Sequence, residues 1–306
     1  MKREKTCNGF FQTTKSMYKR LILKRGKKKS YRRFLKGKLR NLAKYKHILT
    51  FLEKRERFAV TTIILTSGVL TIQLIWQDVR FYLVLFLAFI SYLLTAWSLK
   101  EDIKSNEWIL LFILPVFFTA SVSLFYFLLP PRWIIRLTTT TMFALGTYAI
   151  LLVENIYNVA VERSIQLLRA AQSVGLLVSL AVIFLTSNII YSLRLPFWAN
   201  MLIMTIISFF LAMQSLWSVN LEKHFNKELY LYSLIIAVGV GELSMALSFW
   251  PIENASFSLF LSASYYSLVG VVQQHILERL FINVIREYII VFILTFILAF
   301  VITKWG

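Results

Sequence analysis

The chain has 306 residues, of which 58% are hydrophobic, and it carries a formal net charge of +19 at pH 7. This apolar content exceeds the roughly 45 to 50% typical of soluble domains, which excludes an ordinary soluble globular protein. Cys7 is the only cysteine, so an internal disulfide framework and a cysteine-based metal site are excluded as well.

The positive charge is concentrated at the amino-terminal end. Residues 1–57 contain 21 of the 34 Lys and Arg residues and three acids, so this segment carries +18. The remaining residues contain 13 basic and 12 acidic side chains. We therefore divide the chain into a basic cytoplasmic tail, residues 1–57, and a transmembrane domain, residues 58–306. The first 30 residues are expected to be disordered because they are polar, charged and poor in apolar side chains.

The second half of the tail has a helical pattern. In residues 31–52, Leu and Tyr recur every three or four positions with Lys and Arg between them, which predicts a basic amphipathic helix. Such a helix beside a membrane span favours binding to anionic lipid headgroups. The alternatives are binding to nucleic acid or the ribosome, and a topology signal without a ligand. Nucleic acid is not expected, because the tail has no nucleic-acid motif and few aromatic residues for base stacking. The basic residues expected at the lipid surface are Lys27, Lys28, Lys29, Arg32, Arg33, Lys36, Lys38 and Arg40.

Long apolar runs separated by short polar turns follow the tail. A run of about 20 apolar residues in a helix crosses the ~30 Å hydrocarbon core of a bilayer. The predicted fold is therefore all-α: a polytopic transmembrane helical bundle of about nine spans. The spans are residues 58–76, 80–98, 108–129, 133–153, 171–192, 197–219, 229–250, 255–274 and 287–303. At the end of the chain, the alternative is one long helix over residues 275–303.

The distribution of basic residues between the turns predicts the orientation. With the tail inside, the cytoplasmic segments contain 29 Lys and Arg residues and the outer segments contain five. The positive-inside rule then places the amino terminus in the cytoplasm and the carboxyl terminus outside. We expect a protein integral to the bacterial cytoplasmic membrane, with the lipid bilayer as its main partner.

Five glutamates recur along the chain at intervals of 54, 55, 60 and 56 residues: Glu53, Glu107, Glu162, Glu222 and Glu278. Each precedes a span that starts from the cytoplasm. Two spans with short turns have about this length, and an acid near a helix start is stabilised by the helix dipole. The alternative is a duplicated helical hairpin.

Glu242 is the acid that lies deepest within a predicted span. It is about eight residues, or roughly 12 Å, from the outer end of the seventh span. An ionised carboxylate at this depth is costly unless it is paired or hydrated. Its small neighbours Gly239, Gly241 and Ser244 allow another helix to approach closely. We expect either an ion or proton site, or a hydrogen-bonded carboxyl group that faces the interior of the bundle.

Two polar stretches lie near the predicted cytoplasmic ends of the spans. Their candidate residues are Glu154, Asn158, Glu162, Arg163, His275, Glu278 and Arg279. Carboxylates and a histidine are suited to metal binding or acid–base chemistry. However, neither stretch has a recognised ligand spacing, so no metal or cofactor is predicted, and solvated helix ends are the simpler interpretation.

These features predict an integral membrane protein without identifying its activity. A structural protein or an accessory subunit of a membrane complex is the first hypothesis. A transporter or permease for a small solute or ion is the alternative, although the chain is poor in the Gly and Pro residues that break helices at many substrate sites. A lipid-modifying enzyme is not expected, because the sequence shows no convergent acid, base or metal site.

Overall fold

The computed structural model describes residues 54–74, 79–99, 109–161, 166–221 and 226–303. Every secondary-structure element within these ranges is a helix, and these ranges contain no β-strand. The elements are α2 (Lys54–Leu74), α3 (Arg80–Leu99), α4 (Leu110–Phe125), the 3-10 helix η3 (Tyr126–Leu128), α5 (Trp133–Ala160), α6 (Leu168–Ser192), α7 (Phe197–Asn220), α8 (Lys227–Leu247), α9 (Asn254–Ile276) and α10 (Ile282–Ile302).

The predicted all-α bundle is confirmed for the described part of the chain, which contains nine helices long and apolar enough to cross a membrane. Most helix ends lie within four residues of the prediction, whereas the end of α5 and the start of α10 differ more. Helix α5 continues to Ala160 instead of residue 153, because its polar last turns are buried against other helices. The last two spans are separate helices, because residues 277–281 are not helical and Glu278 has a φ of 56°, so one long helix over residues 275–303 is excluded. Helix α10 begins at Ile282 instead of residue 287.

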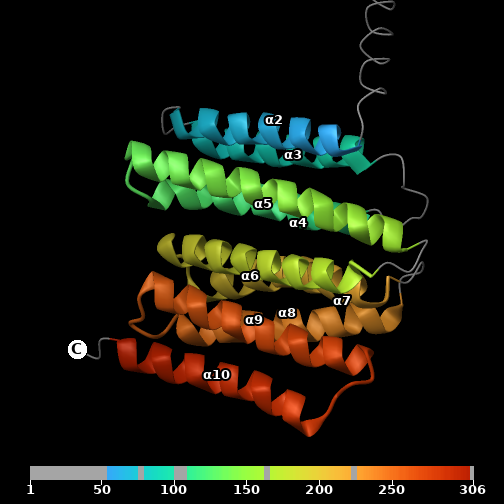
Figure 1. The fold of residues 1–306 in the computed structure, drawn as a ribbon. Helices are drawn as coiled ribbons and strands as arrows, with labels where there is room; N and C mark the ends of the chain where they lie inside the picture. Colours follow the sequence, from blue (N-terminus) through green and yellow to red (C-terminus); the bar gives the residue numbers. More distant parts are fainter. Residues whose placement is uncertain (1–53, 75–78, 100–108, 162–165, 222–225, 304–306) are drawn as a thin grey trace, which may run out of the picture. The chain divides into compact units, whose positions relative to one another are not determined.

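The helices run alternately in opposite directions and stack in the order of the chain (Figure 1). Helices α2 and α3 form the first layer, followed by α4 with α5, α6 with α7, and α8 with α9, while α10 lies against α9. We call the two ends of this bundle the Lys54 end, where α2 begins, and the Ile302 end, where α10 ends. Helix α7 is central, because it contacts α4, α6, α8 and α9.

The closest helix pair is α7 with α8. A Cβ atom added at Gly241 would overlap the Thr205 Oγ1 atom and would lie 3.2 Å from the Met201 carbonyl oxygen. The absence of a side chain at Gly241 therefore permits the close approach that was expected around Glu242.

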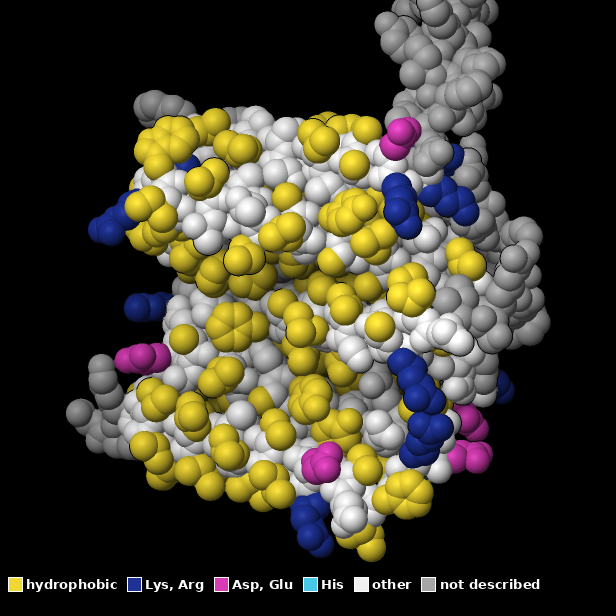
Figure 2. Space-filling model, in the orientation of Figure 1, with side chains coloured by type: hydrophobic (Ala, Val, Ile, Leu, Met, Phe, Trp, Pro, Cys, Tyr) yellow, Lys and Arg dark blue, Asp and Glu magenta, His cyan; other side chains and the backbone are white. Residues whose placement is uncertain are grey.

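The outer surface is apolar over the length of the helices. Helix α3, for example, exposes Phe81, Tyr82, Leu85, Phe86 and Phe89. Figure 2 shows hydrophobic side chains across the visible face, with charged groups mostly towards its two ends. A surface of this kind is suited to the hydrocarbon core of a bilayer, with the charged ends in the headgroup regions.

Three parts of the sequence prediction lie outside the described residues. These are the tail with its amphipathic helix and lipid-surface residues, Glu162 and Arg163 of the first polar stretch, and four of the five recurring glutamates.

Candidate functional site

The most deeply buried carboxyl group of the described bundle belongs to Glu154. Glu154 is 0% exposed and lies six residues before Ala160, the last residue of α5, or about 9 Å along the helix. The Gln214 side chain of α7 donates a hydrogen bond from Nε2 to Glu154 Oε1. Gln214 is 3% exposed, so the contact is sealed inside the protein.

The Glu154–Gln214 pair leaves two acceptor atoms without a hydrogen-bond partner among the described protein atoms. They are Glu154 Oε2 and Gln214 Oε1, and both are fully buried. A single proton on Glu154 Oε2, donated to Gln214 Oε1, would satisfy both atoms, because a carboxylic acid and an amide pair through two hydrogen bonds in a ring. A water molecule between them would do the same. The pair can therefore bind a proton or a small hydrogen-bonding molecule such as water.

Polar side chains from three helices surround this pair. Ser215 of α7 lies 3.4 Å from Ser179 Oγ of α6 and 3.4 Å from Tyr265 Oη of α9, measured from its own Oγ atom. Gln273 Nε2 of α9 donates to the Ser215 carbonyl oxygen over 3.1 Å. A small pocket of about 10 Å³, close to the space that one water molecule occupies, is lined in part by Gln214, Ser215, Ser179 and Gln273. We call Glu154, Gln214 and these polar neighbours the Glu154 cluster.

Tyr157 closes the cluster on the α5–α6 side. Its hydroxyl group donates to the Ala171 carbonyl oxygen over 3.0 Å. Gly175 lies at the tip of this side chain, and a Cβ atom there would overlap the Tyr157 hydroxyl group. The glycine thus makes room for a tyrosine that lines the cavity.

A buried stripe on α7 extends from the Glu154 cluster towards the Ile302 end. Its polar members are Asn200, Ser208, Gln214, Ser215 and Ser218, all buried. Their spacing places them on one side of the helix at about 100° per residue.

Two apolar residues interrupt this stripe. Met204 and Leu211 are both 0% exposed and lie between its polar positions. The stripe is therefore a series of polar positions separated by apolar contacts.

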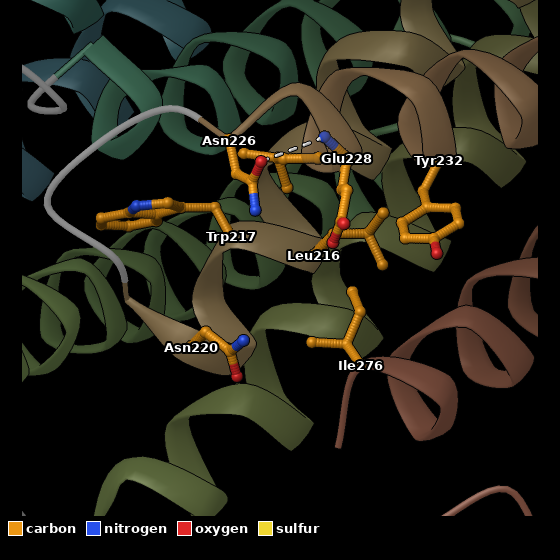
Figure 3. A pocket seen from close by; sticks show the side chains of 8 residues that line it. Leu216, Trp217, Asn220, Asn226, Glu228, Tyr232 and Ile276 are labelled. Carbon is orange, nitrogen blue, oxygen red and sulfur yellow. Dashed lines mark hydrogen bonds between the residues drawn. The ribbon is translucent and has the colours of Figure 1, made fainter. Parts of the chain in front are cut away.

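A second pocket lies at the Lys54 end, where α7 ends, α8 begins and α9 ends. It has a volume of about 60 Å³, and Figure 3 shows Trp217, Asn226, Glu228 and Tyr232 around it. Asn226 caps α8 by accepting a hydrogen bond from the Glu228 backbone N–H over 3.4 Å. Capping accounts for the polar side chain of Asn226 in this pocket.

The predicted site residues fall into separate places. Glu242 is exposed on the outer surface of α8, so the prediction that its side chain faces the bundle interior is wrong. On α8 the inward positions next to it are Gly241 and Ser244. The carboxyl group that faces the interior is Glu154 instead.

The residues of the two predicted polar stretches lie in different environments. Glu154 and Asn158 are buried, which corrects the prediction of solvated helix ends for these two residues. His275, Glu278 and Arg279 are exposed at the end of α9 and beyond it. The His275 Nε2 atom lies 3.2 Å from the hydroxyl group of Tyr232. Among the described residues, no three His, Cys, Asp or Glu side chains are placed to hold a metal ion.

Comparison with known proteins places this bundle in a family. The model of the family described as "Protein of unknown function (DUF5656)" matches residues 59–302, which is more than half of the chain. The chain belongs to this family. The DUF5656 segment runs from the first turns of α2 to the end of α10, so it contains the whole Glu154 cluster. No curated protein and no solved structure matched the chain.

Proposed function

We propose that this chain is a membrane transport protein that carries protons, and that Glu154 is the group that takes up and releases the proton. The observation that supports this proposal is the buried Glu154–Gln214 pair with one unpartnered acceptor atom on each side chain. A carboxyl group within a membrane-spanning helix is costly and is commonly a proton or ion site. A structural role alone would be served at lower cost by two apolar side chains.

The α7 stripe supports transport over a purely local site. It provides polar positions on both sides of Met204 and Leu211, from the Glu154 cluster to Asn200 near the Ile302 end. Passage past these two apolar residues requires α7 to shift or rotate against its neighbours. Movements of this kind between packed helices are the usual basis of alternating access.

We place the Lys54 end on the cytoplasmic side of a bacterial membrane, following the bias of basic residues in the sequence. In this orientation the Glu154 cluster is buried in the cytoplasmic half of the bundle. The basic tail then lies near anionic lipid headgroups of the inner leaflet, which attract polybasic segments.

Proton flux into proteoliposomes tests the proposal. The protein is reconstituted with a pH-sensitive dye inside the vesicles, and a potassium gradient with valinomycin provides the driving potential. We expect the wild type to acidify the vesicles and Glu154→Gln to abolish this flux, because the amide cannot release a proton at this position. Glu242→Gln is the matched control, since it makes the same change on the lipid-facing surface of α8. Equal flux in Glu154→Gln and wild type would exclude Glu154 as the carrier.

An accessory role in a membrane complex is the second candidate function. Helix α10 supports it, because only 6% of its most apolar stretch is buried within the protein. Such a helix has most of its surface available for lipid or for another membrane protein. A folded, reconstituted wild type without proton flux would favour this role over transport.

A further inference from the structure

Glu242 is an ionisable side chain that faces the surrounding lipid from within a span. It is exposed and lies five residues before Leu247, the last residue of α8, or about 8 Å along the helix axis. Exposed hydroxyl groups within other spans, such as those of Thr138 and Thr141, donate to carbonyl oxygens of their own helix. Among the described residues, none forms a hydrogen bond or an ion pair with Glu242. Because an unpaired carboxyl group in hydrocarbon is costly, Glu242 requires a partner from outside this bundle.

The lipid-facing surface of α8 has a regular pattern around Glu242. Its members are spaced alternately by four and three residues: Leu231, Ile235, Val238, Glu242, Met245 and Phe249. Leu231, Ile235 and Phe249 are 55%, 54% and 66% exposed, and Val238 and Met245 are half-buried. We call these six residues the α8 seam. Parallel helices with this alternating spacing pack as a left-handed pair, which is also the prevailing geometry between membrane helices.

The α8 seam is complementary to itself. Apolar side chains alone do not favour another helix over lipid, because lipid tails are equally apolar, so the polar group in the seam decides what covers it. Two copies in one membrane have the same orientation. A two-fold axis along the membrane normal therefore brings the two seams together in parallel, with Glu242 opposite Glu242. A protonated carboxyl group donates one hydrogen bond and accepts another, so two such groups satisfy each other.

A basic side chain is the alternative partner for a carboxyl group. Among the described residues at the Ile302 end, the basic side chain furthest inside a helix is Arg136, three residues after Trp133 at the start of α5. Its Nε atom donates to the Tyr126 hydroxyl group over 3.0 Å, and its guanidinium carbon lies 5.2 Å from the centre of the Trp133 ring. Arg136 is therefore engaged within its own copy, and a second copy offers Glu242 instead.

We propose that two copies of this chain associate side by side in the membrane through the α8 seam, with hydrogen bonds between the two Glu242 carboxyl groups. A single polar residue in such a seam fixes the register of the two helices. Helix α8 packs on α7 and α9 through its buried positions, so the exposed seam remains available for this contact. The dimer goes beyond the proposed transport function and does not depend on it.

Disulfide crosslinking in membranes tests the arrangement. In a Cys7→Ser background, single cysteines replace Ile235 or Phe249 of the α8 seam, or Leu85 of α3 as the matched control. Leu85 is 70% exposed and lies five residues from the start of α3 at the Ile302 end, so it faces lipid about as far from this end as Glu242 does. We expect oxidation with copper phenanthroline to give covalent dimers of both seam variants and none of Leu85→Cys, because a disulfide requires Cα atoms within about 7 Å. Equal crosslinking at the three positions, or none at the seam, would overturn the proposal.

The role of Glu242 itself is measured by the dissociation constant of the dimer in liposomes, from energy transfer between labelled copies at increasing ratios of lipid to protein. We expect Glu242→Leu to raise this constant by about tenfold, because it removes the hydrogen bonds and keeps the apolar packing of the seam. Glu242→Gln should stay within about threefold of the wild type, since two amides pair as two carboxylic acids do.

Both substitutions lie at an exposed position, and the unfolding midpoint of each variant shows whether its bundle is folded. A leucine variant that associates as tightly as the wild type would show that the carboxyl groups do not hold the dimer, and the proposal would be overturned. A wild type that stays monomeric would assign the α8 seam to lipid or to a different membrane protein and would overturn it as well. Because association is measured without flux, its failure is separate from a failure of proton transport.

Discussion

Replacing Glu154 by leucine probes the buried pair most directly, because leucine has a similar size and no polar atom. In this variant Gln214 Nε2 loses its acceptor, and Gln214 Oε1 has no donor at position 154, while both atoms remain inside the bundle. Glu154→Gln is the matched control. An amide at position 154 can accept from Gln214 Nε2 and donate to Gln214 Oε1, so both hydrogen bonds of the ring are kept.

The expected magnitude follows from the cost of an unpaired buried amide. In soluble proteins this cost is about 1–3 kcal/mol, whereas hydrogen bonds between membrane helices contribute about 0.6 kcal/mol on average and about 1.7 at most. We expect Glu154→Leu to lower the free energy of unfolding by about 1–2 kcal/mol and Glu154→Gln to stay close to the wild type. Gln214→Leu should also destabilise, because it leaves the Glu154 carboxyl group without its donor. The double variant Glu154→Leu/Gln214→Leu should be more stable than the sum of the single variants by at least about 0.6 kcal/mol.

Reversible unfolding in bicelles, followed for the wild type and the four variants, measures these differences. The coupling energy between positions 154 and 214 is obtained from the double-mutant cycle. Additive effects of the two leucine substitutions would show that the side chains act independently, and the reasoning based on the buried pair would then be refuted.

The close packing of α7 on α8 predicts that Gly241→Ala lowers the thermal unfolding midpoint, at a cost of about 1–3 kcal/mol, because the new methyl group overlaps Thr205 Oγ1. Gly239→Ala is its control and should have little effect, since a Cβ atom there meets only Leu268 Cδ1 at 3.4 Å. The orientation predicts that a membrane-impermeant maleimide labels Cys7, the only cysteine, in permeabilised cells and not in intact spheroplasts. From the basic charge of the tail we expect a peptide of residues 1–57 to float with anionic vesicles at 0.1 M salt. It should be released near 1 M salt, because the screening length falls from about 10 Å to about 3 Å. Flotation with neutral vesicles would contradict this expectation.

The number and type of the helices could be predicted from the sequence because lipid imposes a simple rule. Every backbone polar group must be paired within the segment, so a long apolar run has to be a helix. The end of α5 was harder to predict. Hydropathy falls at Glu154 and Asn158, and the predicted span ended there, whereas the helix continues because both side chains are buried by tertiary contacts.

The candidate site illustrates a different limit. Depth along a span can be counted from the sequence, and this favoured Glu242 over Glu154. The direction of a side chain around the helix depends on which neighbours pack there, and Glu242 lies about 100° away from the inward-facing Gly241. A signal for Glu154 was present in the spacing of Ile150, Glu154 and Tyr157, which places the carboxyl group in line with buried apolar positions. Its partner Gln214 is 60 residues further along the chain, and only the fold brings the two together.

The layered order of the helices has a consequence for biogenesis. Each layer packs on the layers next to it in the chain, and the most extensive contacts join α6 and α7 with α8 and α9. Helices that leave the ribosome first can therefore find their partners before the last ones are inserted into the membrane. The Glu154–Gln214 hydrogen bond can form only after α7 has been inserted. The carboxyl group of α5 therefore remains without this partner until two further helices, α6 and α7, are in the membrane.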